Sequence, residues 1–407
     1  MAASLVERVS SKYRRDGLIG LLQLVGPIVL KEPFRQYLLA RGTDDIVSRA
    51  SSIVSIEDSS KSTITYGGLR EPPHPSQIIS VVGRGVATPR EIYEFRDATV
   101  VGSRPLFLAD GKYIAPSSIG TTDVCKSEWK LRKTFHFNVS YANLLRRSHS
   151  RAKFIRDVDT AFLLTGYFGD FGHWTFEILP KMYAYEEYAK LSGINPVILT
   201  GTNLNSWQKE SLKLLGYPPD SLLQMGSEPL SVRQLLVPSH RFLTETHVPT
   251  YPSIHDLTWV RDRIKRNLPT VDRSFGERIF ISREDAPKRH IRNRKAVRDV
   301  LEEYDFEVYE PGRLSFADQV RLFSGADLIV GPYGAGVSNI IFAENAKFVE
   351  LVVDAEANIH HFVLANLLNI DYEYVSCRPH VERGVKIRNS DMEVDIAQLR
   401  DVIEAHV

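Results

Sequence analysis

A histidine and a carboxylate stand four residues apart where a glycine-punctuated loop meets a predicted helix. The loop contains Gly166, Gly169 and Gly172, and the helix is predicted to begin at His173. His173 and Glu177 would then share one helix face as residues i and i+4, where an imidazole and a carboxylate can meet. Such a pair could accept the proton of an attacking hydroxyl group as a general base. A structural hydrogen-bonded pair explains the same two residues equally well, and the sequence leaves both interpretations open.

A second group of residues could hold a pyrophosphate. Residues 331–336 (GPYGAG) directly follow a predicted buried strand and precede a predicted helix that contains Asn339. Glycines allow the backbone to approach a ligand closely, and a helix N-terminus offers free N–H groups and a partial positive charge. A tight turn that requires positive φ is the alternative explanation for these glycines. The strand–turn–helix context favours the binding of a phosphate-bearing ligand.

Basic residues are concentrated in the stretch 278–295 (RIFISREDAPKRHIRNRK), where seven residues are Lys or Arg. Ser282 and Arg283 come at the carboxyl end of a predicted strand, which is where ligands bind in open α/β sheets. Arg283, Lys288 and Arg289 could neutralise phosphates, the arginines through two parallel hydrogen bonds each. A solvated charged loop is the usual explanation of such a run. The position at a strand end favours ligand binding for Ser282 and Arg283.

Apolar strands that alternate with helices must position these groups. Predicted strands occupy residues 161–165, 196–200, 234–237, 278–282, 306–309, 327–330 and 347–353. This alternation is typical of parallel βαβ units. Ser315 is predicted to cap a helix that ends at Gly325. We therefore predict two Rossmann-like halves with a boundary in residues 238–253, and a final helix over residues 398–406.

The N-terminal part has a different character. Residues 17–30 (GLIGLLQLVGPIVL) are almost entirely apolar, but this stretch is shorter than the roughly 20 residues that span a bilayer. Lys31 and Glu32 follow where a signal peptide would have small residues. The stretch is either a buried packing segment, which we favour, or a segment in a membrane interface. Residues 43–75 are predicted to be a connector, and residues 92–150 a small β-rich region.

Composition narrows the classes of function. The 407 residues include 51 Lys and Arg against 50 Asp and Glu, which gives a net charge of +1. This balance argues against a dedicated nucleic-acid-binding protein, which usually carries a clear basic excess. Cys125 and Cys377 are the only cysteines, too few for a disulfide framework or a cysteine-based zinc site. That usage favours a reducing compartment.

In their order and spacing, these motifs resemble glycosyltransferase family 61, which includes bacterial capsular-polysaccharide-type transferases. The resemblance covers about residues 160–375. It rests on Gly172-His173-Trp174 with Glu177 and Leu179-Pro180, on residues 278–283, on the helix from Asn293, on residues 306–308, on Leu314-Ser315 with Gln319-Val320, on residues 331–339, and on Glu350-Leu351. The chain departs from the family at two positions, because the family often has His where this chain has Tyr333 and Asp where it has Glu177.

The resemblance implies an α/β protein with a GT-B-like fold, in which two Rossmann-like domains face a cleft and a small β-containing region lies at the N-terminus. The expected segments are an N-terminal apolar and helical segment with a linker (1–60), an acceptor-side domain (61–253), a nucleotide-sugar-binding domain (254–380) and a tail helix (381–407).

The same resemblance implies an inverting transfer of a sugar from a nucleotide-sugar donor to a glycan or a lipid-linked saccharide. Glu177 is the first candidate for the catalytic base, and His173 is the second. Ser282 and Arg283 would face the donor phosphates, and Glu350 would lie near the nucleoside. The full donor-binding set is Ser282, Arg283, Arg289, Tyr333, Gly334, Ala335, Gly336, Asn339 and Glu350.

We expect a UDP-sugar as donor, no metal or other cofactor, and no nucleic-acid partner. Asp157-Val158-Asp159 matches the DxD pattern that holds a divalent ion in another transferase fold, but it precedes its predicted strand, so we predict an exposed turn. A cytoplasmic enzyme of capsule or other cell-surface polysaccharide synthesis fits best, with peripheral membrane contact left open. Two other classes of protein remain as alternatives: a related enzyme such as a pyruvyl transferase or an epimerase, and a catalytically silent glycan- or nucleotide-binding protein.

Overall fold

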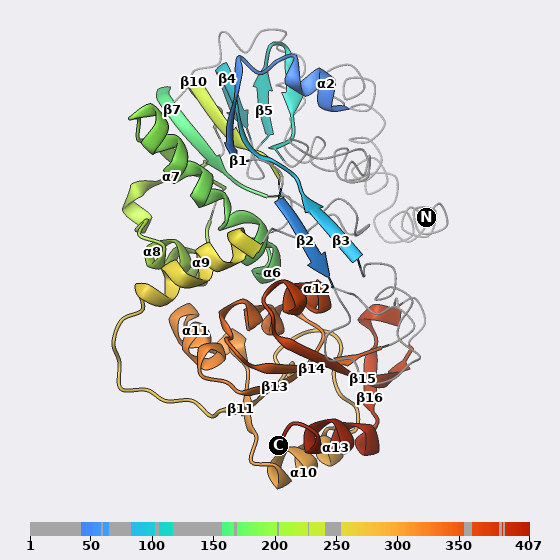
Figure 1. Cartoon of the computed structure of the whole chain (residues 1–407). Helices are drawn as coiled ribbons and strands as arrows, with labels where there is room; N and C mark the ends of the chain where they lie inside the picture. The colour runs from blue at the N-terminus through green and yellow to red at the C-terminus, as the bar shows by residue number, and fades with distance from the viewer. Residues whose placement is uncertain are drawn as a thin grey trace, which may run out of the picture.

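The computed structural model describes residues 42–57, 60–64, 83–101, 106–116, 157–166, 169–201, 203–226, 228–240, 254–353, 360–381, 385 and 387–407. The apolar stretch 17–30, Cys125 and residues 58–59 and 65–75 of the predicted connector lie outside these residues. The described part of that connector is regular structure and not the irregular linker that we predicted, because it contains a helix over Gly42–Val47 and strands over Ser52–Glu57 and Ser60–Ile64. The described chain is a mixed α/β protein with two large sheets, one in the upper and one in the lower half of Figure 1.

Within the described residues, eight strands form the first sheet, in the order β6-β5-β4-β10-β7-β8-β9 with β1 paired to β4. Their bounds are β1 Ser52–Glu57, β4 Arg90–Val101, β5 Leu106–Ala109, β6 Lys112–Ile114, β7 Asp157–Leu164, β8 Val197–Thr200, β9 Leu222–Gln224 and β10 Leu230–Pro238. Strands β10, β7, β8 and β9 are parallel, as the alternation of strands and helices predicts. Strand β10 also pairs antiparallel with β4, which the sequence pattern did not indicate.

The side chains of β7 alternate between two hydrophobic clusters. Phe162 and Leu164 face the helices α7 (Lys181–Ser192), α8 (Ser206–Leu214) and α9 (Ile254–Arg266), while Ala161 and Leu163 pack on the other face with residues of β4 and β5. Both faces of this strand are therefore buried, which explains why its sequence is a continuous apolar run rather than an alternating one. The short helix α2 (Gly42–Val47) adds Ile46 to the second cluster. Strands β2 (Ser60–Ile64) and β3 (Gly83–Ala87) pair with each other as a separate ribbon.

Six described strands form the second sheet, in the order β12-β11-β13-β14-β15-β16. Their bounds are β11 Arg278–Ile281, β12 Glu307–Tyr309, β13 Leu328–Pro332, β14 Lys347–Val352, β15 Asp371–His380 and β16 Asp391–Val394. All pairs are parallel except β15 with β16. Because β12 lies on one side of β11 and β13 on the other, the strand order reverses at β11, as it does in doubly wound sheets.

Helices cover both faces of the second sheet. The helices α10 (Arg294–Glu303) and α13 (Ile396–Glu404) bury their apolar residues against one face. The helix α11 (Phe316–Ser324), the 3-10 helix η8 (Ala335–Phe342) and α12 (His360–Leu367) cover the other face and lie toward the first sheet (Figure 1). Ser315 caps α11 as predicted, since its hydroxyl accepts a hydrogen bond from Asp318 N at 3.0 Å.

One hydrophobic cluster runs without interruption between the two sheets. It includes Phe162 and Leu212 from the first half of the chain and Phe316, Phe342 and Phe348 from the second. Polar contacts cross the same junction, because the carboxylate of Glu210 accepts hydrogen bonds from Phe316 N at 2.8 Å and from Ala317 N at 3.2 Å. N–H groups at the start of a helix have no partner within the helix, so Glu210 of α8 caps a helix of the second sheet.

Two expected helices differ from prediction. The helix expected at His173 consists of a short α-turn, α6 (Phe171–His173), that continues into a π-helix, η4 (Trp174–Ile178). Pro180 has no N–H for a helical bond, so the chain restarts as α7 at Lys181. The segment after the glycine turn is the 3-10 helix η8 rather than an α-helix.

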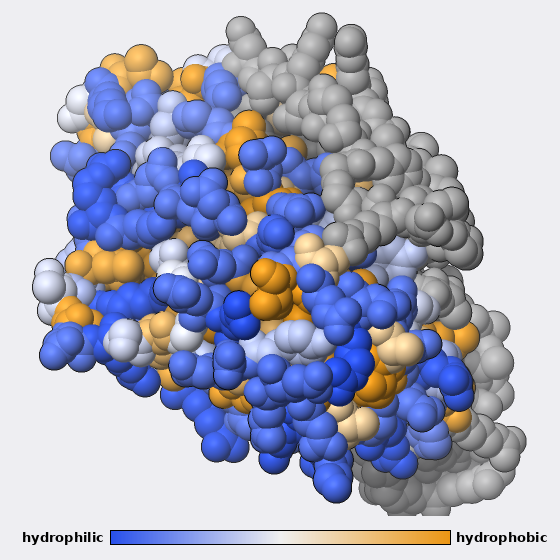
Figure 2. Space-filling model, turned by 60° about the horizontal axis from the view of Figure 1, so that its bottom comes forward, coloured by the Kyte–Doolittle hydropathy of each residue, from blue (hydrophilic) through white to orange (hydrophobic). Residues whose placement is uncertain are grey.

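None of the helices in the described part of the chain is long and apolar enough to cross a membrane. Figure 2 brings the lower end of the Figure 1 view forward and shows a mostly hydrophilic surface. Hydrophobic residues appear on that face as small, separate patches, as is normal for a folded protein in water.

Candidate functional site

A cavity of about 370 Å³ lies at the junction between the two sheets. The carboxyl ends of β11 and β13 form its floor through Ser282, Arg283 and Pro332, and Ala335 and Gly336 follow. The first half of the chain contributes Phe171, Trp207 and Glu210. The cavity therefore sits at the point where the strand order reverses, which is the usual ligand site of an open α/β sheet.

The glycine turn at this edge is shaped by close packing rather than by positive φ. Gly334 has an extended backbone, with φ 170° and ψ 173°, so any residue could adopt its conformation. A Cβ at this position would overlap the guanidinium of Arg283, lying 2.6 Å from Cζ. At Gly331 a Cβ would lie 2.9 Å from Cγ1 of Val337. The absence of side chains therefore allows Arg283 to lie directly on the turn.

Two arginines converge on this turn. Burial, together with the positive charge of Arg289, lowers the pKa of Arg283 to about 10. The Nε atom of Arg283 is buried and has no hydrogen-bond partner among the described residues. The guanidinium of Arg289 lies 4.8 Å from the ring centre of Tyr333, which is a cation–π contact. The backbone of Arg289 has a positive φ of 63°. Two neighbouring cations of this kind favour an anionic ligand between them.

Tyr333 and Glu350 belong to a polar network under the turn. The ring of Tyr333 lies 5.2 Å from that of His361, and His361 Nδ1 lies 2.6 Å from Glu350 Oε1. The hydroxyl of Tyr372 donates to the other carboxylate oxygen at 2.8 Å, and His361 Nε2 lies 3.2 Å from Ser338 Oγ. Glu350, which we expected near the nucleoside, is completely buried, so its side chain lies beneath the turn and does not line the cavity.

Asn339 is also completely buried. Its amide nitrogen donates to Gln319 Oε1 at 2.9 Å and to the carbonyl of Gly336 at 3.0 Å. The side chain therefore fastens η8 to α11 and holds the end of the turn. Ser282 is nearly buried as well, and its hydroxyl accepts a hydrogen bond from Glu284 N at 3.2 Å.

The structure brings His173 and Glu177 together across one turn of the π-helix, through a short contact between Nδ1 and Oε1. Asp170 caps the helix by accepting a hydrogen bond from His173 N at 3.2 Å. Leu179 N donates to Trp174 O at 2.9 Å, the wider spacing that defines a π-helix. The side chain of His173 is 22% exposed and that of Glu177 only 6%, so the imidazole is the more accessible partner.

The ionisation of Glu177 is set by competing effects. Burial raises the pKa of this carboxyl group, but the hydrogen bond with His173 and the charges of His240, His173 and Lys181 together outweigh burial and lower it. Glu177 therefore stays ionised at neutral pH and is a weak proton acceptor. An ionised carboxylate bonded to Nδ1 orients the imidazole so that Nε2 is the nitrogen that would take a proton.

Two further residues of this group were missed from the sequence. Lys181 is buried, which lowers its pKa to about 8, and its Nζ donates to Thr165 O at 2.7 Å. Burial and the neighbouring charges of His361 and His173 lower the pKa of His360 to about 3. The spacing of four residues from His173 to Glu177 and again to Lys181 could have revealed the lysine. The adjacent histidines after the strand at 347–353 were the available signal for His360.

Within the described residues, no group of three or more His, Cys, Asp or Glu side chains is arranged to hold a metal ion. Asp157 and Asp159 lie in the first residues of β7, not in a turn as predicted, because they extend its pairing with β10. Both are exposed, and Asp159 forms an ion pair with Arg233 at 2.8 Å. They begin β7, whereas the cavity lies at the carboxyl ends of the strands of the second sheet.

Residues 171–349 match the model of a protein family described as Glycosyltransferase 61. The match begins at α6 and ends in β14, so it includes the His173–Glu177 pair, the two arginines and the glycine turn. No curated protein shows significant similarity to the chain.

Proposed function

This chain belongs to glycosyltransferase family 61 through residues 171–349, and we propose that it transfers a sugar from a nucleotide-sugar donor to an acceptor hydroxyl with inversion at the anomeric carbon. The observation that carries the proposal is the convergence of Arg283 and Arg289 on the glycine turn at the reversal point of the second sheet. A donor diphosphate placed there would be held by two cations and by backbone N–H groups at the start of η8.

The two sheets would then act as the two halves of a GT-B enzyme. The donor would occupy the cavity, with its diphosphate at Arg283 and its base near Trp207 and Phe171, whose rings are 5.2 Å apart. A UDP-sugar is our first choice of donor. The arginines would supply the positive charge that a metal supplies elsewhere, so we propose a metal-independent reaction.

We assign the proton transfer to His173 rather than to Glu177, which reverses the order expected from the sequence. The acceptor hydroxyl oxygen would attack the anomeric carbon while its proton passes to His173 Nε2. The bond from that carbon to the diphosphate oxygen would break, and its electron pair would leave on the diphosphate beside Arg283 and Arg289. Glu177 would stabilise the imidazolium that forms, as the carboxylate does in other histidine-based sites.

We propose as acceptor a glycan or a lipid-linked saccharide of cell-surface polysaccharide synthesis, such as capsule, with the enzyme on the cytoplasmic side of the membrane. Product analysis tests this assignment, because a transferase extends a glycan whereas a pyruvyl transferase or an epimerase does not. A protein that binds a nucleotide sugar without forming a longer glycan from any tested acceptor would contradict it.

Thermal unfolding in the presence of UDP-, GDP-, CMP- and dTDP-sugars tests the donor. A specific donor at 100 times its Kd should add about 2.7 kcal/mol of stability. Arg283→Ala should abolish this gain, while Arg266→Ala, an exposed arginine at the end of α9, should keep it. If no nucleotide sugar stabilises the protein, or if both variants respond alike, the proposed donor site is wrong.

A further inference from the structure

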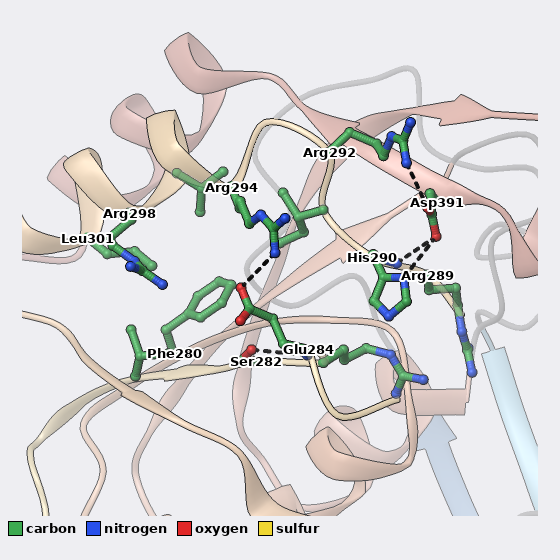
Figure 3. Close-up of a pocket in the computed structure, with 14 residues that line it drawn as sticks. Phe280, Ser282, Glu284, Arg289, His290, Arg292, Arg294, Arg298, Leu301 and Asp391 are labelled. Atoms are coloured by element: carbon green, nitrogen blue, oxygen red, sulfur yellow. Dashed lines mark hydrogen bonds and ion pairs between the residues drawn. The ribbon is translucent and has the colours of Figure 1, made fainter. Parts of the chain in front are cut away.

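A second cavity, of about 520 Å³, opens beside the candidate transfer site on the α10 side of the second sheet. Only Ser282 and Arg283 line both cavities. Figure 3 shows how the second one is built: Arg294 and Arg298 of α10 lie on the same side as Phe280 and Leu301, and Arg289 and Arg292 of the loop after β11 lie across from them. Its volume lies within the range of small-molecule sites.

Positive charge dominates this cavity. Five arginines line it, at positions 283, 289, 292, 294 and 298, against the two carboxylates Glu284 and Asp391. Arg294 forms an ion pair with Glu284 at an N–O distance of 3.7 Å, and Arg292 forms one with Asp391 at 3.5 Å. Both distances are long for an ion pair. Arg298 forms no ion pair among the described residues, and Figure 3 shows it apart from both pairs. The cavity therefore keeps an excess of cationic groups that an anion can satisfy.

The wall on the other side is apolar. Phe280, Val297 and Leu301 are almost completely buried, belong to one hydrophobic cluster and line the cavity. Val308, on the edge strand β12, is 48% exposed and extends this wall outward. A ligand that fills the space would thus have an anionic end and an apolar end.

The arginine-bearing loop is fastened and is not a loose solvated segment. His290 N donates to Asp391 Oδ1 at 2.9 Å, and Arg292 N donates to the carbonyl of Met392 at 2.8 Å. The Asn293 side chain donates to Val394 O at 2.8 Å and accepts from Val394 N at 3.0 Å. These bonds to β16 hold the cationic groups near their binding positions before a ligand arrives, which lowers the entropic cost of binding.

We propose that this cavity, which we call the α10 pocket, binds an organic phosphate with an apolar group as a second ligand, separate from the sugar donor. The phosphate would lie between Arg294 and Arg298 of α10, and the apolar group would lie on Phe280, Leu301 and Val308. Arg283 and Arg289 would stay with the donor diphosphate. A nucleotide and a lipid phosphate share this chemistry. Ligand binding to the α10 pocket can be measured without turnover. This proposal can therefore fail or succeed independently of the proposed sugar transfer.

Calorimetric titration of the full chain with inorganic phosphate, AMP and geranyl phosphate tests the proposal. At least one organic probe should bind about tenfold or more tightly than inorganic phosphate, and the tighter of the two identifies the source as nucleotide or lipid. Arg298→Glu should weaken that binding about tenfold or more. Arg266→Glu, which changes the net charge equally on α9, should leave it within about twofold. Val308→Ser should weaken the binding of the organic probe and leave the binding of inorganic phosphate unchanged.

Three results would overturn the proposal. In the first, the organic probes bind no tighter than inorganic phosphate, which shows that the apolar group is not recognised. In the second, Arg298→Glu has no more effect than Arg266→Glu, which means that probe binding reflects only general surface charge. In the third, Arg298→Glu weakens UDP binding by the same factor as probe binding, which means that the α10 pocket belongs to the donor site. Melting curves for each variant exclude a failure to fold as the cause.

Discussion

Gly334→Ala isolates the contact between the glycine turn and Arg283. The extended backbone at this residue accepts alanine without strain, so the added methyl group acts only on its neighbours. Its position lies 2.6 Å from Cζ of Arg283, closer than real Cβ atoms pack, and 3.2 Å from Nε, which is a tight contact. The guanidinium must therefore move away from the place where we put the donor diphosphate.

The expected loss follows from the hydrogen bonds that the displaced guanidinium can no longer make. Hydrogen bonds to charged groups contribute about 1.5–3 kcal/mol each, and 1.4 kcal/mol corresponds to a tenfold change in Kd. Gly334→Ala should thus weaken the binding of the donor nucleoside diphosphate by about 10- to 100-fold. Calorimetric titration with UDP measures this loss directly.

Gly325→Ala is the matched control. This glycine ends α11 with φ −99°, and a Cβ there would meet only Arg321 O, at an ordinary 3.6 Å. Its UDP affinity should stay within about twofold. A double-mutant cycle completes the test, because Gly334→Ala should cost less than about 0.5 kcal/mol when Arg283 is already alanine. Unchanged affinity in the single variant, or full additivity in the cycle, would refute the role given to this contact.

Three further predictions concern the His173–Glu177 pair and two buried charged groups. His173→Ala should lower kcat by about 10²–10⁴ and Glu177→Gln by less, since the carboxylate only orients the base; steady-state rates near wild type for both would remove the pair from the chemistry. Lys181 has a pKa of about 8 in the folded protein and 10.5 when unfolded, so the unfolded state binds more protons between these values. Stability should therefore rise from pH 8 to 10.5 by up to about 3 kcal/mol relative to Lys181→Met; urea unfolding curves that change in parallel for both proteins would rule this out. Asp256→Asn should cost about 3 kcal/mol of unfolding free energy, because this buried carboxylate pairs with a buried arginine. The exposed Asp159→Asn should cost under about 1 kcal/mol, and equal losses in chemical denaturation would contradict the argument.

The elements of the second sheet were predictable because their signals are local. The apolar run at 278–282 and the alternation of strands and helices after it gave β11 to β14 in the right order. The Ser315 cap and the buried face of α11 follow from residues within one or two turns of each other. Such short-range patterns survive in any tertiary context that buries one face of the helix.

The candidate site was predictable in its location and less so in its detail. The strand ends and the glycine turn pointed to the edge where Arg283 and Gly334 meet. The place of Glu350 depends on His361 and Tyr372, which lie on other elements, and no local pattern encodes that contact. The π-helix likewise depends on how the segment 171–180 packs between the sheets, since its residues have no distinctive π-helical signal. The pairing of β10 with β4 joins residues more than a hundred positions apart.

The hydrophobic cluster that passes between the two sheets has a consequence for how the chain can be handled. If either half were expressed alone, aromatic residues such as Phe162 or Phe316 would lose their partners and face water. Each isolated half would expose a broad hydrophobic surface and tend to self-associate. Exchanging one half for that of a relative would require matching side chains along this hydrophobic cluster. New substrate specificities are therefore better sought by altering loops at the cavity rim than by exchanging whole halves.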